Sequence, residues 1–217
     1  MAPLPKNKDG DGDDEPRGGG GNTGTGGPTG GGSSGGPGAT PDPQTAVVGA
    51  SIAFHTNDND KDDDTGVEVY VADQFGVVAA LLADVASDRP LTLGHFDDDS
   101  DSGPHPLLVR RRQSGQNFTL RELLDAGIVE LRISPKGFRF PFFPGTGEFT
   151  GGPLQGIKVS DFPLAGGDGN DTWRFNFTLA IRGANGTSLR GTVSGVSLNE
   201  NHRVQQFALR EFMRLRA

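Results

Sequence analysis

The sequence predicts an all-β protein, an antiparallel β-sandwich of about seven to eight strands. Several segments alternate apolar and polar residues with a period of two, which is the pattern of strands with one buried face. Short turn-like stretches separate them, and Asn185-Gly186 is a strong hairpin signal. Clear helix signals occur only in one short central segment and at the C-terminus, so strands must supply the layers of the fold.

The composition divides the chain into three parts. Most of the excess among the 35 glycines lies before residue 40, and residues 17–38 are nearly all Gly, Ser, Thr and Pro. Such a segment has no side chains to bury and cannot offset the entropy lost on ordering. We therefore predict a disordered, Gly-rich tail over residues 1–45, the sandwich over residues 46–201, and a basic amphipathic segment over residues 202–217.

Each predicted strand has its own signal. The clearest is Thr172–Ile181, in which Trp173, Phe175 and Phe177 and the apolar residues that follow them all point one way. Val77–Asp84 has the pattern of either a helix or a buried strand, and its place after the turn-like "DQFG" favours a strand. In chain order the predicted strands are Ser51–His55, Val67–Ala72, Val77–Asp84, Pro106–Arg110, Ile128–Ser134, Thr172–Ile181 and Leu189–Leu198, with the first two half-buried.

Helix signals occur at two places. Phe118–Gly127 contains Thr119 as a cap, Glu122 three residues further on, and a glycine at its end. The C-terminal "HRVQQFALREFMRLRA" predicts a short basic amphipathic helix. That helix would lie on an anionic surface or a partner, or pack on its own acidic domain.

Composition also limits the classes of protein to which the chain can belong. It has no cysteine, so disulfides and thiolate metal sites are excluded. The net charge of −8 argues against a binder of nucleic-acid phosphates. The N-terminus lacks the apolar core of a classical signal peptide, and no apolar run approaches the length of a membrane span. We expect a soluble protein, either cytoplasmic or exported by a non-classical route.

Carboxylates and amides concentrate in three segments at the edges of predicted strands: residues 56–66, 94–103 and 166–171. Calcium takes six to eight oxygen ligands with loose geometry, and carboxylates on loops supply them. So many Asp side chains repel one another unless cations neutralise them. Three such clusters predict a calcium site, although Asp and Asn also favour turns for conformational reasons alone. The candidate ligands are Asp58, Asp60, Asp64, Asp97, Asp99, Asp101, Asn170 and Asp171.

Two other calcium motifs do not fit. An EF-hand loop that starts at Asp58 has Asp63 where glycine is required and Val69 where glutamate is required, and a start at Asp97 fails at the same two positions. Residues 166–174 match one nonapeptide of a repeat-in-toxin roll, but such a roll needs several stacked turns. A strand follows this single match, which we therefore interpret as accidental.

Three stretches in this order resemble the PLAT (lipoxygenase-homology) β-sandwich and its calcium-binding relatives: "HTNDNDKDDDTGVEVYV", "GHFDDDSDSG" and, after "VELRIS", "GNDTWRFNF". The resemblance covers Ser51 to Ser197. It implies calcium ligands around Asp58–Thr65 and at Asn170-Asp171. It also implies a module that docks a protein onto membranes, lipids or partner proteins and is not itself catalytic.

We expect a non-enzymatic calcium-binding module. Its partner, a protein or a membrane surface, would bind the Phe-rich cluster Phe138–Phe143 or the basic C-terminal segment, although burial of those rings in a satellite core is the simpler explanation for them. One alternative is a structural or adhesive subunit of a larger assembly. Another is a small metal-dependent hydrolase, in which His55 or His95 would join the neighbouring carboxylates, although a structural hydrogen bond explains either histidine more simply.

Overall fold

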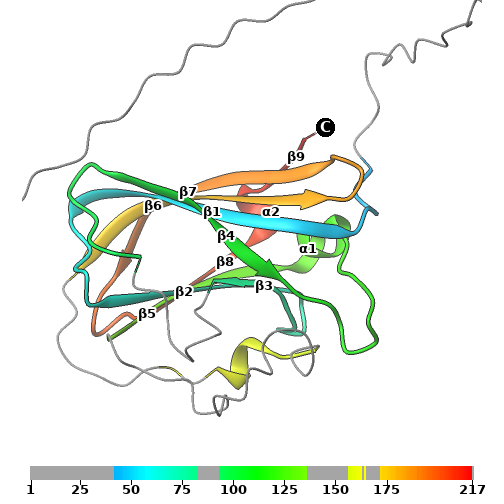
Figure 1. Ribbon diagram of the computed structural model, residues 1–217, viewed down its shortest axis with the longest axis horizontal. Coiled ribbons are helices and arrows are strands. Elements are labelled where there is room, and N and C mark those ends of the chain that lie inside the picture. Colours follow the sequence, from blue (N-terminus) through cyan, green and yellow to red (C-terminus); the bar gives the residue numbers. More distant parts are fainter. Residues whose placement is uncertain (1–41, 83–92, 136–155, 163, 165–171, 217) are drawn as a thin grey trace, which may run out of the picture. The chain divides into compact units, whose positions relative to one another are not determined.

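The computed structural model describes residues 42–82, 93–135, 156–162, 164 and 172–216 (Figure 1). The chain divides into two units, Met1–Pro37 and Gly38–Ala217, and every described residue belongs to the second. The predictions for residues 1–41 lie outside the described residues. The last residues assigned to the tail bind the helix α1 (Leu120–Ala126): the backbone N–H of Arg121 donates to Pro43 O, and that of Leu120 to Thr45 O.

Within the described residues, nine strands form one antiparallel sheet in the order β8-β5-β2-β3-β4-β1-β6-β7-β9. This confirms the all-β prediction. The sheet curls into two layers, with β1, β6, β7 and β9 in one, β2, β3, β5 and β8 in the other, and β4 passing between them (Figure 1). The strands are β1 (Val47–Asn59), β2 (Thr65–Ala72), β3 (Val78–Leu82), β4 (Asp101–Val109), β5 (Ile128–Pro135), β6 (Trp173–Gly183), β7 (Ser188–Leu198), β8 (Val204–Ala208) and β9 (Arg214–Arg216).

Strand β4 joins the layers because its two ends pair with different neighbours. Its first part pairs with β1, from His55 opposite Asp101 to Ala50 opposite Leu107. Its last residues pair with β3, where Val109 lies opposite Ala80. One strand therefore turns the corner between the layers, and the faces that meet inside the curl form the main core.

The main core is built from the inward residues that the alternation of β6 predicts. Trp173, Phe175 and Phe177 are all buried, and the rings of Trp173 and Phe175 stack with centroids 3.8 Å apart. Phe54 of β1 packs on this pair, with its centroid 5.3 Å from Trp173 and 5.7 Å from Phe175. The indole N–H of Trp173 donates to the hydroxyl of Thr56 at 3.2 Å, so its polar atom is satisfied inside the core.

Several local predictions are confirmed. Thr119 caps α1 in a capping box with Glu122, and Gly127 ends the helix. Residues 78–82 of the ambiguous segment form a strand. A turn at Asn185-Gly186 joins β6 to β7, with Gly186 at φ 88°. No helix in the described part of the chain is long and apolar enough to cross a membrane.

One prediction is confirmed only in part, and another is wrong. A short C-terminal helix is present as α2 (Leu209–Phe212), but it covers four residues and is flanked by the strands β8 and β9, which bring the number of strands in the described residues to nine. The backbone of β8 pairs with β5, and Leu209 is buried in the core, so this segment belongs to the sandwich. Strand β2 is not half-buried, because all eight of its residues are buried.

The segment that covers β2 belongs to the long Phe/Pro/Gly-rich stretch after β5. Val159 and Phe162 of this segment pack on the outer face of the sheet, where the rings of Phe162 and Tyr70 lie 4.7 Å apart. Phe138–Phe143 lies outside the described residues. For the described part of the stretch, the structure shows a second, smaller core on the outside of the sheet.

The aromatic core predicts a large difference between two phenylalanines. Phe54→Ala removes a ring that is 2% exposed, and we expect it to lower the free energy of unfolding by about 3–5 kcal/mol. Phe75→Ala removes a ring that is 66% exposed and should change this free energy by less than about 0.5 kcal/mol. Urea denaturation of both variants measures the difference, and equal losses would contradict this description of the core.

Candidate metal centre

An isolated antiparallel bridge between Lys61 and Phe96 brings two of the acidic loops together. The backbone N–H of Lys61 donates to Phe96 O at 3.1 Å, and the N–H of Phe96 donates to Lys61 O at 3.0 Å. Both side chains point inward and are buried. Because side chains alternate along extended backbone, the residues on either side of each must point outward. The bridge therefore places Asp60, Asp62 and His95, together with Asp97, on one outer surface.

Three of these side chains can offer ligand atoms to one ion. The atoms offered by Asp60, Asp62 and His95 all lie within 4.8 Å of one another. His95 Nε2 is 3.6 Å from Asp60 Oδ2 and 3.2 Å from Asp97 Oδ1. Ligand atoms around a tetrahedral zinc ion are about 3.4 Å apart, given metal–ligand distances of about 2.1 Å. The separation of 3.6 Å between His95 Nε2 and Asp60 Oδ2 is close to that spacing.

The buried side chain of Lys61 lies beneath this surface and supplies a positive charge. Its Nζ donates to the backbone oxygens of Asp62 at 2.8 Å and Thr65 at 3.0 Å, and lies 5.1 Å from the centroid of the Phe96 ring. Burial lowers the pKa of Lys61 to about 8, against the opposing attraction of Asp62, Asp63 and Asp64. At neutral pH most molecules therefore carry a cation under the acidic loop, which offsets part of its charge.

The other predicted ligands have different surroundings. Asp101 accepts a hydrogen bond from the ring of His55, with 2.9 Å between Nδ1 and Oδ1. Asp58 lies 3.9 Å from Arg174 in an exposed ion pair. Asp64 is exposed, and so is Asp99, which has φ 55°. Asn170 and Asp171 lie outside the described residues. Of the predicted ligands, the three-residue cluster contains Asp60 alone, and Asp97 lies beside it.

Asp62 and His95 are not among the eight candidate calcium ligands. The PLAT resemblance covers Asp62 only within the range Asp58–Thr65, and His95 is considered only for the alternative hydrolase. One signal in the sequence could have identified them. In Asp60-Lys61-Asp62 and in His95-Phe96-Asp97, a residue that can be buried lies between two polar residues that would point the opposite way. Only knowledge that Lys61 and Phe96 are paired and buried turns the two patterns into one surface.

The donor set of the cluster suits some metal ions better than others. Two carboxylates with one imidazole provide oxygen and nitrogen donors, which are typical of zinc and other first-row divalent metals. Calcium binds oxygen ligands in larger number and makes no use of imidazole. Three protein ligands would also leave coordination positions for water or for a group of another molecule.

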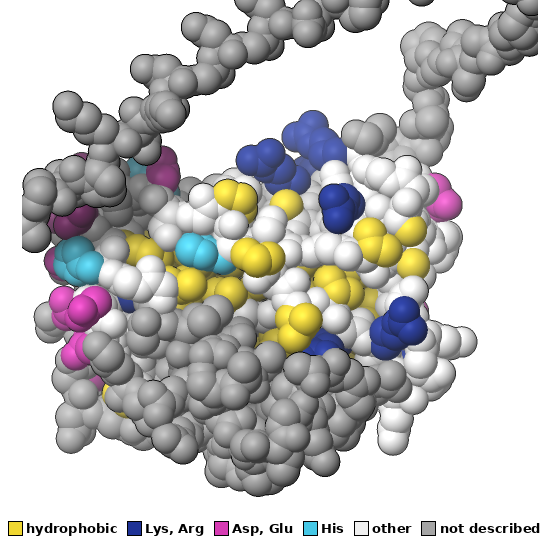
Figure 2. All heavy atoms as spheres, viewed as in Figure 1, with side chains coloured by type: hydrophobic (Ala, Val, Ile, Leu, Met, Phe, Trp, Pro, Cys, Tyr) yellow, Lys and Arg dark blue, Asp and Glu magenta, His cyan; other side chains and the backbone are white. Residues whose placement is uncertain are grey.

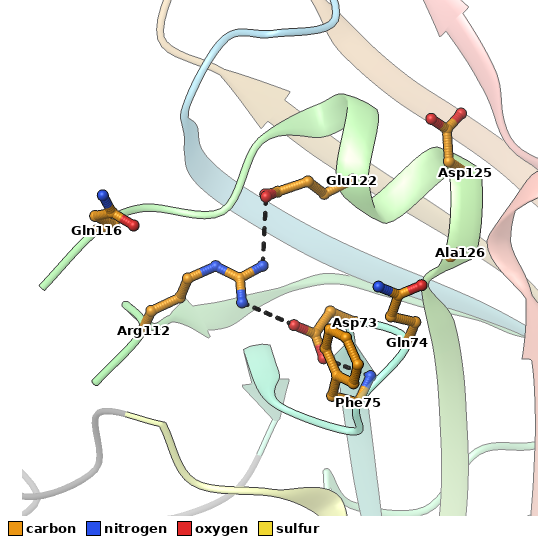
Figure 3. A pocket seen from close by; sticks show the side chains of 8 residues that line it. All are labelled: Asp73, Gln74, Phe75, Arg112, Gln116, Glu122, Asp125 and Ala126. Atoms are coloured by element: carbon orange, nitrogen blue, oxygen red, sulfur yellow. Dashed lines mark hydrogen bonds and ion pairs between the residues drawn. The ribbon is translucent and has the colours of Figure 1, made fainter. Parts of the chain in front are cut away.

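A second polar cluster lines a cavity of about 560 Å³ between α1 and the turn that joins β2 to β3. Figure 3 shows Arg112 between Asp73 and Glu122, at N–O distances of 3.0 and 3.5 Å. The other oxygen of Asp73 accepts from the backbone N–H groups of Phe75 and Val77. The guanidinium also stacks over the Phe118 ring, 4.4 Å from its centroid. The charged groups of this cluster are paired with one another, so we interpret the cluster as a structural contact that holds the helix α1 against the sheet.

A third cluster is buried on the outer face of β2 and β5. Glu68 lies opposite Arg132 and Tyr70 opposite Glu130, so two strands form a square of four polar residues. The Tyr70 hydroxyl donates to Glu68 Oε2 at 2.6 Å. Arg132 binds Glu130 through its Nε, and its other nitrogens donate to the backbone oxygens of Phe162 at 2.7 Å and Val159 at 3.1 Å.

The square fastens the covering segment to the sheet, because the guanidinium of Arg132 reaches across to two of the segment's carbonyl groups. Burial is the main cause that raises the pKa of Glu68 above its ordinary value, while the Tyr70 hydroxyl and Arg132 oppose it. From the alternation of β2 and β5 alone, these polar residues would be expected to face solvent. In the structure, the segment that contains Val159 and Phe162 covers them.

Comparisons of the chain with protein-family models, with curated proteins and with solved structures find no match. The likeness to PLAT domains therefore stays a prediction from the sequence, and the function has to be argued from the geometry of this chain.

The buried carboxyl group predicts a pH dependence of stability. Because the folded-state pKa of Glu68 is raised, the folded protein holds this proton more tightly than the unfolded chain does. The resulting stabilisation is complete below the ordinary pKa of 4.5 and is lost as the pH rises through the raised value. Glu68→Gln keeps an acceptor for Tyr70 without the charge, so we expect the variant to be more stable than the wild type at neutral pH.

Urea denaturation of the wild type and of Glu68→Gln between pH 5 and pH 8 measures this difference. The gap in unfolding free energy should widen as the pH rises. Glu200→Gln, at an exposed position, is the matched control and should follow the wild type. A constant gap across this range would contradict the assignment.

Proposed function

We propose that this protein is a non-enzymatic β-sandwich binding module that holds a divalent cation at Asp60, Asp62 and His95. The observation that carries the proposal is the convergence of their three ligand atoms within 4.8 Å on one outer surface. The cation stiffens the loop end of the sandwich and offers its open coordination positions to an anionic group of a partner.

The choice of metal follows from the donor atoms. The sequence alone predicts calcium, because its carboxylates are many and it does not determine whether a neighbouring histidine joins them. The nitrogen donor of His95 favours zinc or another first-row divalent metal instead. Because the buried cation of Lys61 opposes a second positive charge nearby, we expect moderate affinity and a site that loads and empties with metal concentration.

Metal titration tests the proposal. We expect ZnCl2 to raise the melting temperature of tag-free protein and EDTA to reverse the rise, because the unfolded chain cannot assemble the site. At a free metal concentration 100 times Kd, the stabilisation should be about 2.7 kcal/mol. CaCl2 at the same concentration should produce a smaller shift or none.

Two variants locate the ion. His95→Ala and Asp60→Asn should each abolish most of the zinc-dependent shift, whereas Asp98→Asn, an exposed aspartate of the same run, should retain it. A calcium shift that survives His95→Ala would contradict the proposed donor set and return the assignment to the oxygen-rich calcium site. No shift with either metal would refute metal binding at this surface.

A metal-dependent hydrolase is the second candidate, because three protein ligands with a free coordination position are also the pattern of catalytic zinc sites. Hydrolysis of bis(4-nitrophenyl) phosphate or 4-nitrophenyl acetate by the zinc-loaded protein, lost in His95→Ala, would favour it. An equal rate in the wild type and in His95→Ala would remove this candidate.

A further inference from the structure

Four arginine side chains project from the outer face of the layer formed by β6, β7 and β9. They are Arg182 on β6, Arg190 on β7, and Arg214 and Arg216 on β9, and all four are exposed. The residue beside each of them on its strand is buried or packed against the core, so alternation directs the four guanidinium groups outward.

The strand register brings these cations together. Arg190 lies directly opposite Arg214, and Ser188 lies between Arg182 on one side and Arg216 on the other. Directly opposed residues of antiparallel strands have Cα atoms about 4.5–5.5 Å apart, and like charges in that position are destabilising. Within the described residues, no carboxylate forms an ion pair with any of the four. Among the described residues this cluster of cations is therefore uncompensated, although the net charge of the chain is −8.

An apolar groove continues from this cluster. Its volume is about 610 Å³, and its lining includes Arg182 together with Val48 and Leu108, which are 47% and 40% exposed. The side chain of Arg182 lies across Gly49, where a Cβ atom would be 3.3 Å from Nη2. Figure 2 shows exposed apolar side chains on one face of the molecule with Lys or Arg side chains beside them.

We propose that this arginine face and its groove form a docking surface for an acidic polypeptide segment that carries an apolar side chain. All four cations are arginines, whose planar forks bind carboxylates in pairs of hydrogen bonds. Arg214 and Arg216 are two residues apart on one strand, about 7 Å, which is also the spacing of same-side residues in an extended peptide. The groove beside Arg182 would hold the apolar side chain.

The charge of the rest of the layer favours a short segment over an extended anionic surface. Asp58 and Asp101 lie at the other end of β1 and β4, near Arg174 at the start of β6. Arg174 and Arg182 are eight residues apart on one strand, which is about 27 Å. A short ligand at the basic end is screened from those carboxylates, since the Debye length is about 8 Å at physiological salt. A membrane or a nucleic-acid duplex would meet both ends.

Fluorescence anisotropy with the full chain tests the proposal. The probe is a short labelled peptide that alternates glutamate with serine and ends in leucine. We expect binding that weakens as the salt concentration rises. The affinity should fall about tenfold in Arg190→Ser/Arg214→Ser, because this variant loses two ion pairs with the peptide. The melting temperature of this variant should not fall, because the substitutions remove a like-charge pair. Arg111→Ser/Arg121→Ser removes the same charge elsewhere and should leave the affinity within about twofold of the wild type.

Three results with the peptide would overturn the proposal: no binding at low salt, equal binding by the wild type and Arg190→Ser/Arg214→Ser, or an equal loss of affinity in the control variant. Equally tight, arginine-dependent binding to phosphatidylserine vesicles or to a DNA duplex would overturn it in favour of a general polyanion surface. Arg216 lies near the end of the edge strand β9, where its side chain does not enter the core. The single variant Arg216→Glu should therefore fold normally and also weaken binding. This variant provides the test if the double variant is less stable than the wild type.

Discussion

The burial of Phe96 against the aromatic core determines where the acidic loops lie. Its ring centroid is 5.8 Å from that of Trp173 and 6.3 Å from that of Phe54, so the loop before β4 is held to the strand end that β1 and β6 share. Once Phe96 is buried, its backbone pairs with Lys61, and alternation turns the neighbouring aspartates and His95 outward. The candidate metal centre is therefore a consequence of core packing, and the placement of its three candidate ligands depends on Lys61 and Phe96, which are not among them.

The same packing explains how so acidic a loop is tolerated. Lys61 is drawn inward by the pairing with Phe96, and its ammonium group lies over that ring while it donates to two backbone oxygens. A buried cation costs desolvation, which is why its pKa falls to about 8. The aspartates around it oppose that fall. The buried ammonium group of Lys61 therefore neutralises part of the negative charge of the loop. A metal ion bound at the outer surface would neutralise more of it.

Charge is distributed unevenly over the sandwich, and its two outer faces differ in whether they are covered. The outer face of β2 and β5 is closed by Val159 and Phe162, with the Glu68–Arg132 and Tyr70–Glu130 pairs underneath. On the opposite layer, the arginine face stays open. Sequence patterns treat both faces alike, because each shows polar residues alternating with apolar ones. The difference lies in a segment far along the chain that covers one face and leaves the other exposed.

By itself, the sequence determined the all-β class, the capping of α1, the Asn185-Gly186 hairpin and the inward face of β6, because each depends on propensity or alternation within a few residues. Only the tertiary structure decided the candidate sites. The backbone bridge between Lys61 and Phe96 brings His95 close to Asp60 and Asp62. Arg190 lies opposite Arg214 because β7 pairs with β9, a segment whose local pattern predicts a helix. These juxtapositions join residues distant in the chain, and no local pattern encodes them, since they arise from burying Phe96 and Leu209 in one core.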